Sequence, residues 1–407
     1  MKKKRCLYSI TFGKWIASGA ATLALQLEGL GVFNAGAGVR KARGNSALFF
    51  IAALSLVMPL CQAADKNQIY STIYSHTYSD IAPIDQFFDD LRGPKVAPGD
   101  HAFTTNAVAL GQTVHINDRF GGLRFEVFSR LDYYLQFTPD TAELFWADKN
   151  DVPLDRDRAY DVYLDANHMK AHGFKLGYLG SIEDRFSYHI DVSYLYVYEM
   201  LVGALAGDLD GLGSDAQGEL LLEYYYSDDV FFEREPNDLS ARGIALDFGF
   251  QWHINNRWQI DFKSKDLYSR IYWREQDFTA AQANSERLSF DEQGLLEVSP
   301  ALSWLETERN FRQRLPLQVE LREMFHATSR DSLELQHYAY DKQWFHRVAY
   351  RHRFFSRVST GLSYNLSSQA KGLDLQTPYL RLRLETDDFD LKAAQHMSFT
   401  LGFYIPY

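Results

Sequence analysis

Large apolar and polar residues alternate along most of this 407-residue chain, and that alternation is the feature that most restricts its fold. From Ile244 to Ile254 every second side chain is large and apolar, while Ala, Asp, Gly, Gln and His lie between them. Period-two alternation is typical of a β-strand whose two faces meet different surroundings. The pattern is found again in residues 186–198, 315–322 and 380–385.

Strand length then separates a soluble sheet from a membrane barrel. Many of the alternating runs extend over about 9–12 residues, whereas strands of globular proteins are most often about 5–6 residues long. A tilted strand needs about 9–11 residues to cross a bilayer, and no apolar run reaches the roughly 18–20 residues of a spanning helix. Counting the runs gives about 14 strands, with 12–16 open. We therefore predict an all-β chain folded as a closed antiparallel transmembrane β-barrel.

A turn motif recurs between predicted strands. Residues 114–120, 180–186 and 252–258 share the order Ile, Asn or Glu, Asp or Asn, Arg and an aromatic residue. Asn and Asp tolerate the positive φ of tight hairpins, and the flanking aromatic residues suit a membrane interface. Longer polar connections are found at 148–157, 207–216, 227–241 and 280–293. We expect short turns at one rim of the barrel and long loops at the other.

The end of the chain carries the strongest signal. Large residues alternate with small or polar ones up to an aromatic last residue: Phe399, Leu401, Phe403, Ile405 and Tyr407. On these features, residues 103–407 resemble the porin-like class of bacterial outer-membrane β-barrel proteins, with no specific family. The resemblance implies a location in the outer membrane of a Gram-negative bacterium, short periplasmic turns and longer extracellular loops. It also implies that the last strand is the signal for the barrel-assembly machinery, and that outer-membrane lipid surrounds the barrel.

The first 63 residues read as a leader. Within 39–63, basic residues precede the uncharged apolar run 46–60, and small residues follow it, which is the layout of a secretory signal peptide cut after Ala63. A short membrane anchor and lipidation at Cys61 are the alternatives. Residues 1–38 precede a signal that is complete without them, so we hypothesise that translation starts at Val39.

Residues 64–102 form the next predicted segment, in the periplasm or in the lumen. Within it, Asp80–Leu91 is expected to form a short amphipathic helix, with Asp80 as the cap and Pro83 in the first turn. The segment is either a functional element or only a tether.

Charge excludes one class of partner. The formal net charge is −11, yet residues 1–63 hold eight basic residues and one acid, so the remainder is strongly acidic. Such a chain repels a phosphate backbone, and we expect no nucleic-acid partner. Both cysteines, Cys6 and Cys61, lie in the leader. We expect a mature protein without disulfides.

Charged residues on the predicted strands are the candidate functional residues. A charge at the lipid midplane costs about 2–4 kcal/mol, so these side chains are expected to face the lumen. The constriction candidates are Arg347, Arg351, Arg353, Arg381, Arg383, Glu385, Glu320 and Arg322. Basic side chains that face acidic ones across a lumen can form a constriction that selects solutes. The alternative is that these charges pair only to stabilise the barrel. An interior of about 14 strands is too wide for aliphatic filling and must hold water, polar side chains or a plug.

Other patterns are weaker. Gly207–Asp215 could bind Ca²⁺ through three aspartates, but its spacing does not match an EF-hand loop, so a solvated loop is preferred. The histidines at 326, 337, 346 and 352 lack the spacing of a metal site. We expect no metal, no cofactor and no catalytic residue.

Three functions follow. The first is a water-filled channel for small hydrophilic solutes, for which the net acidity favours cations or neutral molecules. The alternative is an outer-membrane partner in polysaccharide or protein export or surface assembly, with a periplasmic partner. A hydrolase in the barrel wall is the third, and we expect that the chain is not an enzyme. The sequence leaves a homo-oligomer open.

Overall fold

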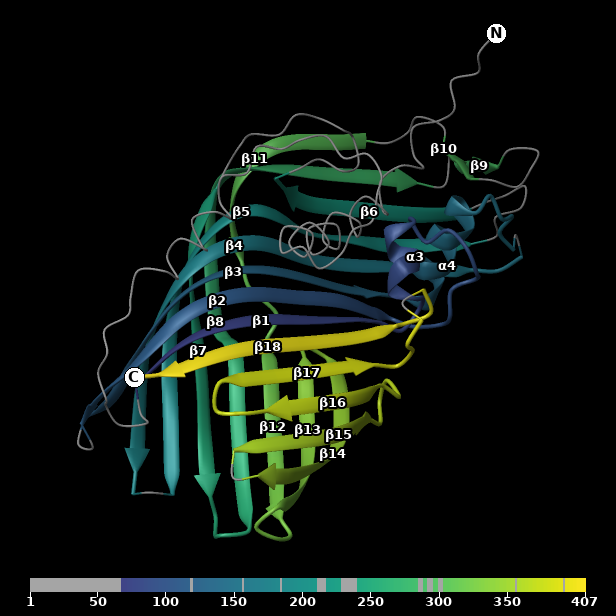
Figure 1. Cartoon of the computed structure of the whole chain (residues 1–407). Coiled ribbons are helices and arrows are strands. Elements are labelled where there is room, and N and C mark those ends of the chain that lie inside the picture. Colours follow the sequence, from purple (N-terminus) through teal and green to yellow (C-terminus); the bar gives the residue numbers. More distant parts are fainter. Residues whose placement is uncertain are drawn as a thin grey trace, which may run out of the picture.

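The computed structural model describes residues 67–407, except 118–119, 156, 184, 211–216, 228–239, 285–287, 291–295, 299–302, 356 and 391. The leader and its signal peptide, the start of the chain and most of the 207–215 loop lie outside these residues. In the described part, sixteen strands form one antiparallel sheet that closes on itself (Figure 1).

Among the residues that the structure describes, two short helices lie between the strands. They are β1 (Gln68–Ser79), α3 (Ile84–Phe88), β2 (His101–Asn117), β3 (Gly121–Phe137), α4 (Pro139–Lys149), β4 (Tyr160–Ile182), β5 (Phe186–Asp210), β6 (Gln217–Tyr226), β7 (Ala241–His253), β8 (Trp258–Asn284), β9 (Leu288–Phe290), β10 (Leu296–Val298), β11 (Ser303–Gln313), β12 (Gln318–His326), β13 (Asp331–Tyr340), β14 (Gln343–Phe355), β15 (Val358–Asn365), β16 (Lys371–Gln376), β17 (Leu380–Thr386) and β18 (His396–Pro406). β9 and β10 form a separate hairpin.

The sheet has fourteen positions around the barrel because two positions are each filled by two strands. β6 and β7 both lie between β5 and β8, one above the other. β11 and β12 likewise share the next position beside β8. The predicted closed antiparallel barrel of about 14 strands is confirmed.

The barrel begins earlier than residue 103, the predicted boundary. Gln68–Ser79 is β1, paired along its length with β2 on one side and with β18 on the other. These two ladders close the sheet and remove its edges, as a barrel in lipid requires. Residues 68–79 are therefore wall rather than a periplasmic or lumen segment.

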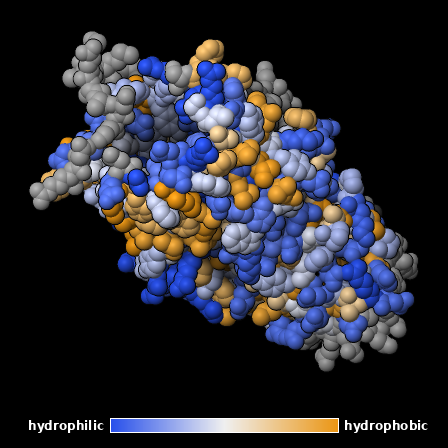
Figure 2. Space-filling view, turned by 90° about the horizontal axis from the view of Figure 1, so that it is seen from below, coloured by the Kyte–Doolittle hydropathy of each residue, from blue (hydrophilic) through white to orange (hydrophobic). Residues whose placement is uncertain are grey.

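Alternation places the apolar side chains outward. Residues opposite each other in register share a face, so one outward residue fixes its neighbours. Val127, Phe174, Val192 and Ile244 share this outer face and are about half exposed. Figure 2 shows apolar residues gathered in a patch on the face in view, bordered by hydrophilic ones.

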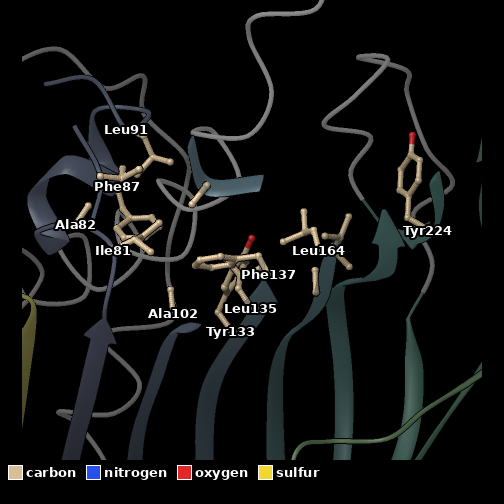
Figure 3. Packing of buried hydrophobic residues seen from close by; sticks show 14 of the residues in the cluster. Ile81, Ala82, Phe87, Leu91, Ala102, Tyr133, Leu135, Phe137, Leu164 and Tyr224 are labelled. Carbon is tan, nitrogen blue, oxygen red and sulfur yellow. The ribbon is translucent and has the colours of Figure 1, made fainter. Parts of the chain in front are cut away.

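The wall extends beyond the height of a bilayer at the end where the long connections lie. β4, β5 and β8 have 23, 25 and 27 residues, more than twice what a crossing needs. There the outer face is covered by residues 81–96, including α3, and by α4. Ile81, Phe87 and Leu91 lie beside Tyr133 and Leu135 of β3 (Figure 3). The cover keeps water from an apolar outer face that lipid no longer reaches.

The helix expected over Asp80–Leu91 is shorter than predicted. It spans Ile84–Phe88, with Pro83 as its first flanking residue. Asp80 instead accepts hydrogen bonds from the backbone N–H groups of Asp100 and His101, both at 3.1 Å. It therefore anchors the start of β2.

The recurring turn motif joins β2 to β3, β4 to β5 and β7 to β8, all at one rim. The connections after β1, β3, β5, β8 and β17, at the other rim, are longer, whereas the β13–β14 and β15–β16 connections there are short. No helix among the described residues is long and apolar enough to cross a membrane.

Candidate functional site: the barrel lumen

Charged side chains of β12–β17 gather on the inner face of one wall. Glu334 of β13 lies at their centre and meets three arginines from the two neighbouring strands, β12 and β14. Its carboxylate oxygens are 3.1 Å from Arg347, 3.4 Å from Arg351 and 3.6 Å from Arg322. Only 2% of the Glu334 side chain is exposed, so its charge is balanced by these arginines rather than by water.

Two further acids extend this network. Asp374 is 2.6 Å from the guanidinium of Arg347 and 2.7 Å from that of Arg383. Glu385 is 3.2 Å from Arg347 and accepts a hydrogen bond of 3.1 Å from Asn365. We call this set the ionic cluster: Glu320, Arg322, Glu334, Arg347, Arg351, Asp374, Arg383 and Glu385.

The structure brings together most of the predicted lumen residues. Six of the eight belong to the ionic cluster, including Glu320, which pairs with Arg322 at 2.6 Å. Arg381 and Arg353 have no ion pair among the described residues. The acids that meet the arginines lie on the same wall, not across the lumen as the sequence-based hypothesis supposed. A role in constriction stays a prediction.

Sequence reasoning missed Glu334 and Asp374. Each is the polar member of an alternating run, since Glu334 follows Leu333 and Asp374 lies between Leu373 and Leu375. That pattern predicts an inward carboxylate but does not give its partner. The partner depends on register between strands that are distant in the sequence.

The wall formed by β3–β8 carries a second set of ion pairs. Arg130 of β3 reaches both carboxylate oxygens of Asp266 on β8, at 3.0 and 2.7 Å. It also meets Asp132 at 2.5 Å. Lys175 lies 3.0 Å from Asp247. Because β3 and β8 are four positions apart, the Arg130–Asp266 pair spans the inside of the barrel.

Aromatic side chains meet across the full width of the lumen. Phe103 of β2 and Tyr340 of β13 have ring centroids 4.8 Å apart, although their strands are seven of fourteen positions apart. Tyr78 and Phe345 lie equally close, and Tyr134 is 5.3 Å from Tyr340. A round barrel of this strand number would be about 28 Å across, so the wall is bent inward here. We call these five residues the aromatic cluster.

Polar contacts hold the same bend. The tip of the β13–β14 hairpin reaches β3, where the Tyr134 hydroxyl donates to Asp341 at 3.2 Å and Lys342 donates to Gln136 at 2.9 Å. The junction between β11 and β12 also reaches β4, where Gln313 donates to the Asn167 side chain at 2.9 Å. Both contacts narrow the lumen in its extracellular half.

A cavity of about 450 Å³ opens at the rim of the short turns. Four arginines line it, together with serine, threonine and glutamine side chains: Arg330, Arg351, Arg353 and Arg357. Asp331 is its one acid, and Thr328, Tyr350 and His352 already contact that carboxylate. Arg330, Arg353 and Arg357 form no ion pair in the part of the chain that the structure describes. We call this cavity the basic vestibule.

The weaker sequence candidates remain without a site. His337 and His346 contact each other at 2.7 Å on the outer face, His326 lines the vestibule, and His352 contacts Asp331. Among the described residues, one group has metal-ligand spacing, Asp80, Asp100 and His101. Its central carboxylate is already used by two backbone N–H groups.

The closed sheet, its apolar outer face and its ionic lumen define an outer-membrane β-barrel protein, located in the outer membrane. No family model and no curated protein matches the chain.

Several solved structures resemble this chain over most of its length. The P. putida toluene transporter TodX is 8% identical, with 85% of this chain and 91% of that chain covered and a TM-score of 0.41. A TodX deltaS2S3 mutant monoaromatic hydrocarbon channel is 10% identical, with 89% and 95% covered and a TM-score of 0.42. The translocator domain of the autotransporter NalP from Neisseria meningitidis is 8% identical, with 97% and 98% covered and a TM-score of 0.30. Likeness at this level does not define a function.

Proposed function

We propose that this barrel is a gated channel for small hydrophilic solutes, with a preference for anions at its periplasmic mouth. The observation that carries the proposal is the basic vestibule, which opens at the short turns and continues into an ionic lumen. Three arginines there are free of acid partners among the described residues. Unpaired charges of one sign in a concave mouth raise the local concentration of oppositely charged solutes.

The charge of the residues that line the vestibule matters more for solute selectivity than the net charge of the whole chain. The net charge of −11 favoured cations in the sequence-based reasoning. A permeating solute responds to the charges within about a Debye length of its path, about 8 Å at physiological salt. Arg330, Arg351, Arg353 and Arg357 lie on that path, with Asp331 as the one opposing acid.

The aromatic cluster supplies the gate in this proposal. Phe103, Tyr340 and their neighbours meet where the β13–β14 hairpin bends inward, so passage requires that hairpin to move outward. The proposal assigns the lumen side chains no catalytic part. An export partner would use the extracellular surface, and the vestibule does not favour that role.

Planar-bilayer conductance of the mature protein tests the proposal. Under a tenfold KCl gradient, the reversal potential should have the sign of chloride selectivity. Replacing Arg330, Arg353 and Arg357 with Gln should move it toward cations, whereas Lys371→Gln, in a strand away from the vestibule, should leave it unchanged. A folded, heat-modifiable barrel that never shows stepwise conductance, even at high voltage, would contradict the channel. A reversal potential that the three substitutions leave unchanged would contradict the anion preference.

A further inference from the structure

Arginines and tyrosines form a row on the outer wall at the level where β5, β7, β8 and β11 lie side by side. The register pairs Tyr196 with Arg242, Arg242 with Tyr272, and Tyr272 with Arg312. Paired residues share a face, and Tyr196 and Tyr272 are 42% and 48% exposed on the apolar side of the wall. The row therefore points away from the lumen.

Three more arginines adjoin this row. Arg270 lies opposite Ile244, which is outward and 45% exposed. Arg274 and Arg314 are exposed and alternate with the buried Trp273 and Gln313. We call the five residues the outer basic band: Arg242, Arg270, Arg274, Arg312 and Arg314.

The charges of the outer basic band are not used within the described protein. None of the five arginines forms an ion pair with a described acid. Arg270 and Arg312 lie 5.6 Å over the rings of Tyr268 and Tyr272, and Nε of Arg270 is buried without a hydrogen-bond partner. By contrast, Lys170 on the same face is 2.7 Å from Glu199. The guanidinium groups of the outer basic band are therefore available to a ligand outside the described chain.

The height of the band matches a lipid headgroup. Tyr196 is ten residues from Phe186, where β5 starts at the short turns. With a rise of about 3.3 Å per residue and a tilt of about 40°, this is about 25 Å above the periplasmic rim. That distance equals the height of the apolar band of an outer-membrane barrel, about 25 Å. The arginines thus lie at the outer interface, above outward apolar residues such as Val192 and Ile190.

We propose that the outer basic band binds the phosphate groups of an anionic glycolipid of the outer leaflet. Guanidinium groups match phosphate oxygens with two parallel N–H donors, and five such groups lie close together on or next to β7, β8 and β11. The tyrosine rings beside them suit the boundary between headgroup and acyl chain. The acyl chains would lie along Ile244, Val192 and Ile190, which are 45%, 50% and 42% exposed.

Native mass spectrometry of the full mature barrel in detergent tests the site, with bisphosphorylated lipid A as the probe. Arg242→Gln, Arg270→Gln and Arg312→Gln together should weaken binding roughly hundredfold, since each interfacial arginine contributes about one kilocalorie per mole. The matched control is the triple substitution of Arg330, Arg353 and Arg357 with Gln in the vestibule, which should keep full binding. Replacing the three band arginines with Lys should restore part of it.

Each binding result either supports or contradicts the proposed phosphate site. Loss of binding in the Gln variant alone, with dephosphorylated lipid A binding poorly to the unaltered protein, supports a phosphate site on the outer wall. Equal binding of both lipid forms, or equal losses in the band and vestibule variants, overturns it. Equal binding of phosphatidylglycerol overturns the outer-leaflet glycolipid as its occupant. Heat-modifiable migration of every variant shows that the barrel is folded, and this test does not depend on conductance.

Discussion

Arg347 is the residue on which most of the ionic cluster depends. Its guanidinium lies within 3.2 Å of three carboxylates from three strands, those of Glu334, Asp374 and Glu385, and its side chain is 5% exposed. A barrel of fourteen positions cannot be filled by aliphatic side chains, so paired charges occupy the interior instead. Removing the arginine would leave the three acids close together without their shared counter-ion.

We predict that Arg347→Gln lowers barrel stability by about 3 kcal/mol or more, the usual cost of breaking a buried ion pair. Arg353→Gln, which removes an exposed arginine of the same strand without an ion pair, should change stability by less than about 0.5 kcal/mol. Urea titration followed by heat-modifiable migration measures both. Equal midpoints for the two variants would show that the pairs around Arg347 contribute no net stability.

The β13–β14 hairpin is the element that narrows the lumen. Its strands are short, 10 and 13 residues, and its tip is a tight turn that contacts β3 through Asp341 and Lys342. The rings of the aromatic cluster pack against each other across the lumen, from strands seven positions apart. Substituting them with smaller side chains should therefore widen the path for solutes and leave the hydrogen bonds between neighbouring strands intact.

Phe103→Ala with Tyr340→Ala should raise the open probability and the single-channel conductance. Both rings are at most 2% exposed, so the double substitution should also lower the stability of the barrel through lost packing. Phe125→Ala, on the lipid-facing side of β3, is the matched control and should leave conductance unaltered. Unchanged conductance in a folded double variant would place the barrier elsewhere.

The cover of the outer wall depends on an ion pair that pH can break. Glu143 of α4 lies 2.6 Å from Lys95 and 2.8 Å from Arg158, and the hydrogen bond from Lys95 is the main reason that its pKa lies below the usual glutamate value. A lowered folded-state pKa means that these contacts stabilise the cover above the ordinary pKa. The contribution is lost as the pH falls through the lower folded value.

Protease cleavage between α4 and β4 should therefore increase as the pH falls from about 6 to about 3, with the barrel still folded. Glu143→Gln should show the raised cleavage already at pH 6 and a weaker change with pH. An acid-tolerant protease and hydrogen exchange give independent readouts. A pH response in the variant equal to that of the unaltered chain would exclude Glu143 as its origin.

At the scale of the whole molecule, the sequence predicted the closed barrel and its strand number because outward apolar positions repeat locally in almost every strand. The sequence did not predict strand β1. There Ile69, Ser71 and Ile73 face outward and alternate with the inward Tyr70 and Tyr74, so the largest side chains face the lumen instead of the lipid. It could not give the inward bend or the acid partners of the arginines. Those depend on contacts between strands that are distant in the sequence.

Deleting residues 68–79 should therefore abolish the folded barrel rather than release a separate segment. β1 supplies both ladders that join β2 to β18, and without it each of those strands keeps an unpaired edge in lipid. Replacing residues 84–96 with a short Gly-Ser linker is the control, because it removes α3 and part of the outer cover but keeps β1 and its ladders. Heat-modifiable migration and protease resistance after refolding into detergent measure both variants. We expect the first to remain unfolded and the second to fold with reduced stability. A heat-modifiable barrel without residues 68–79 would show that β2 and β18 can close the wall by themselves.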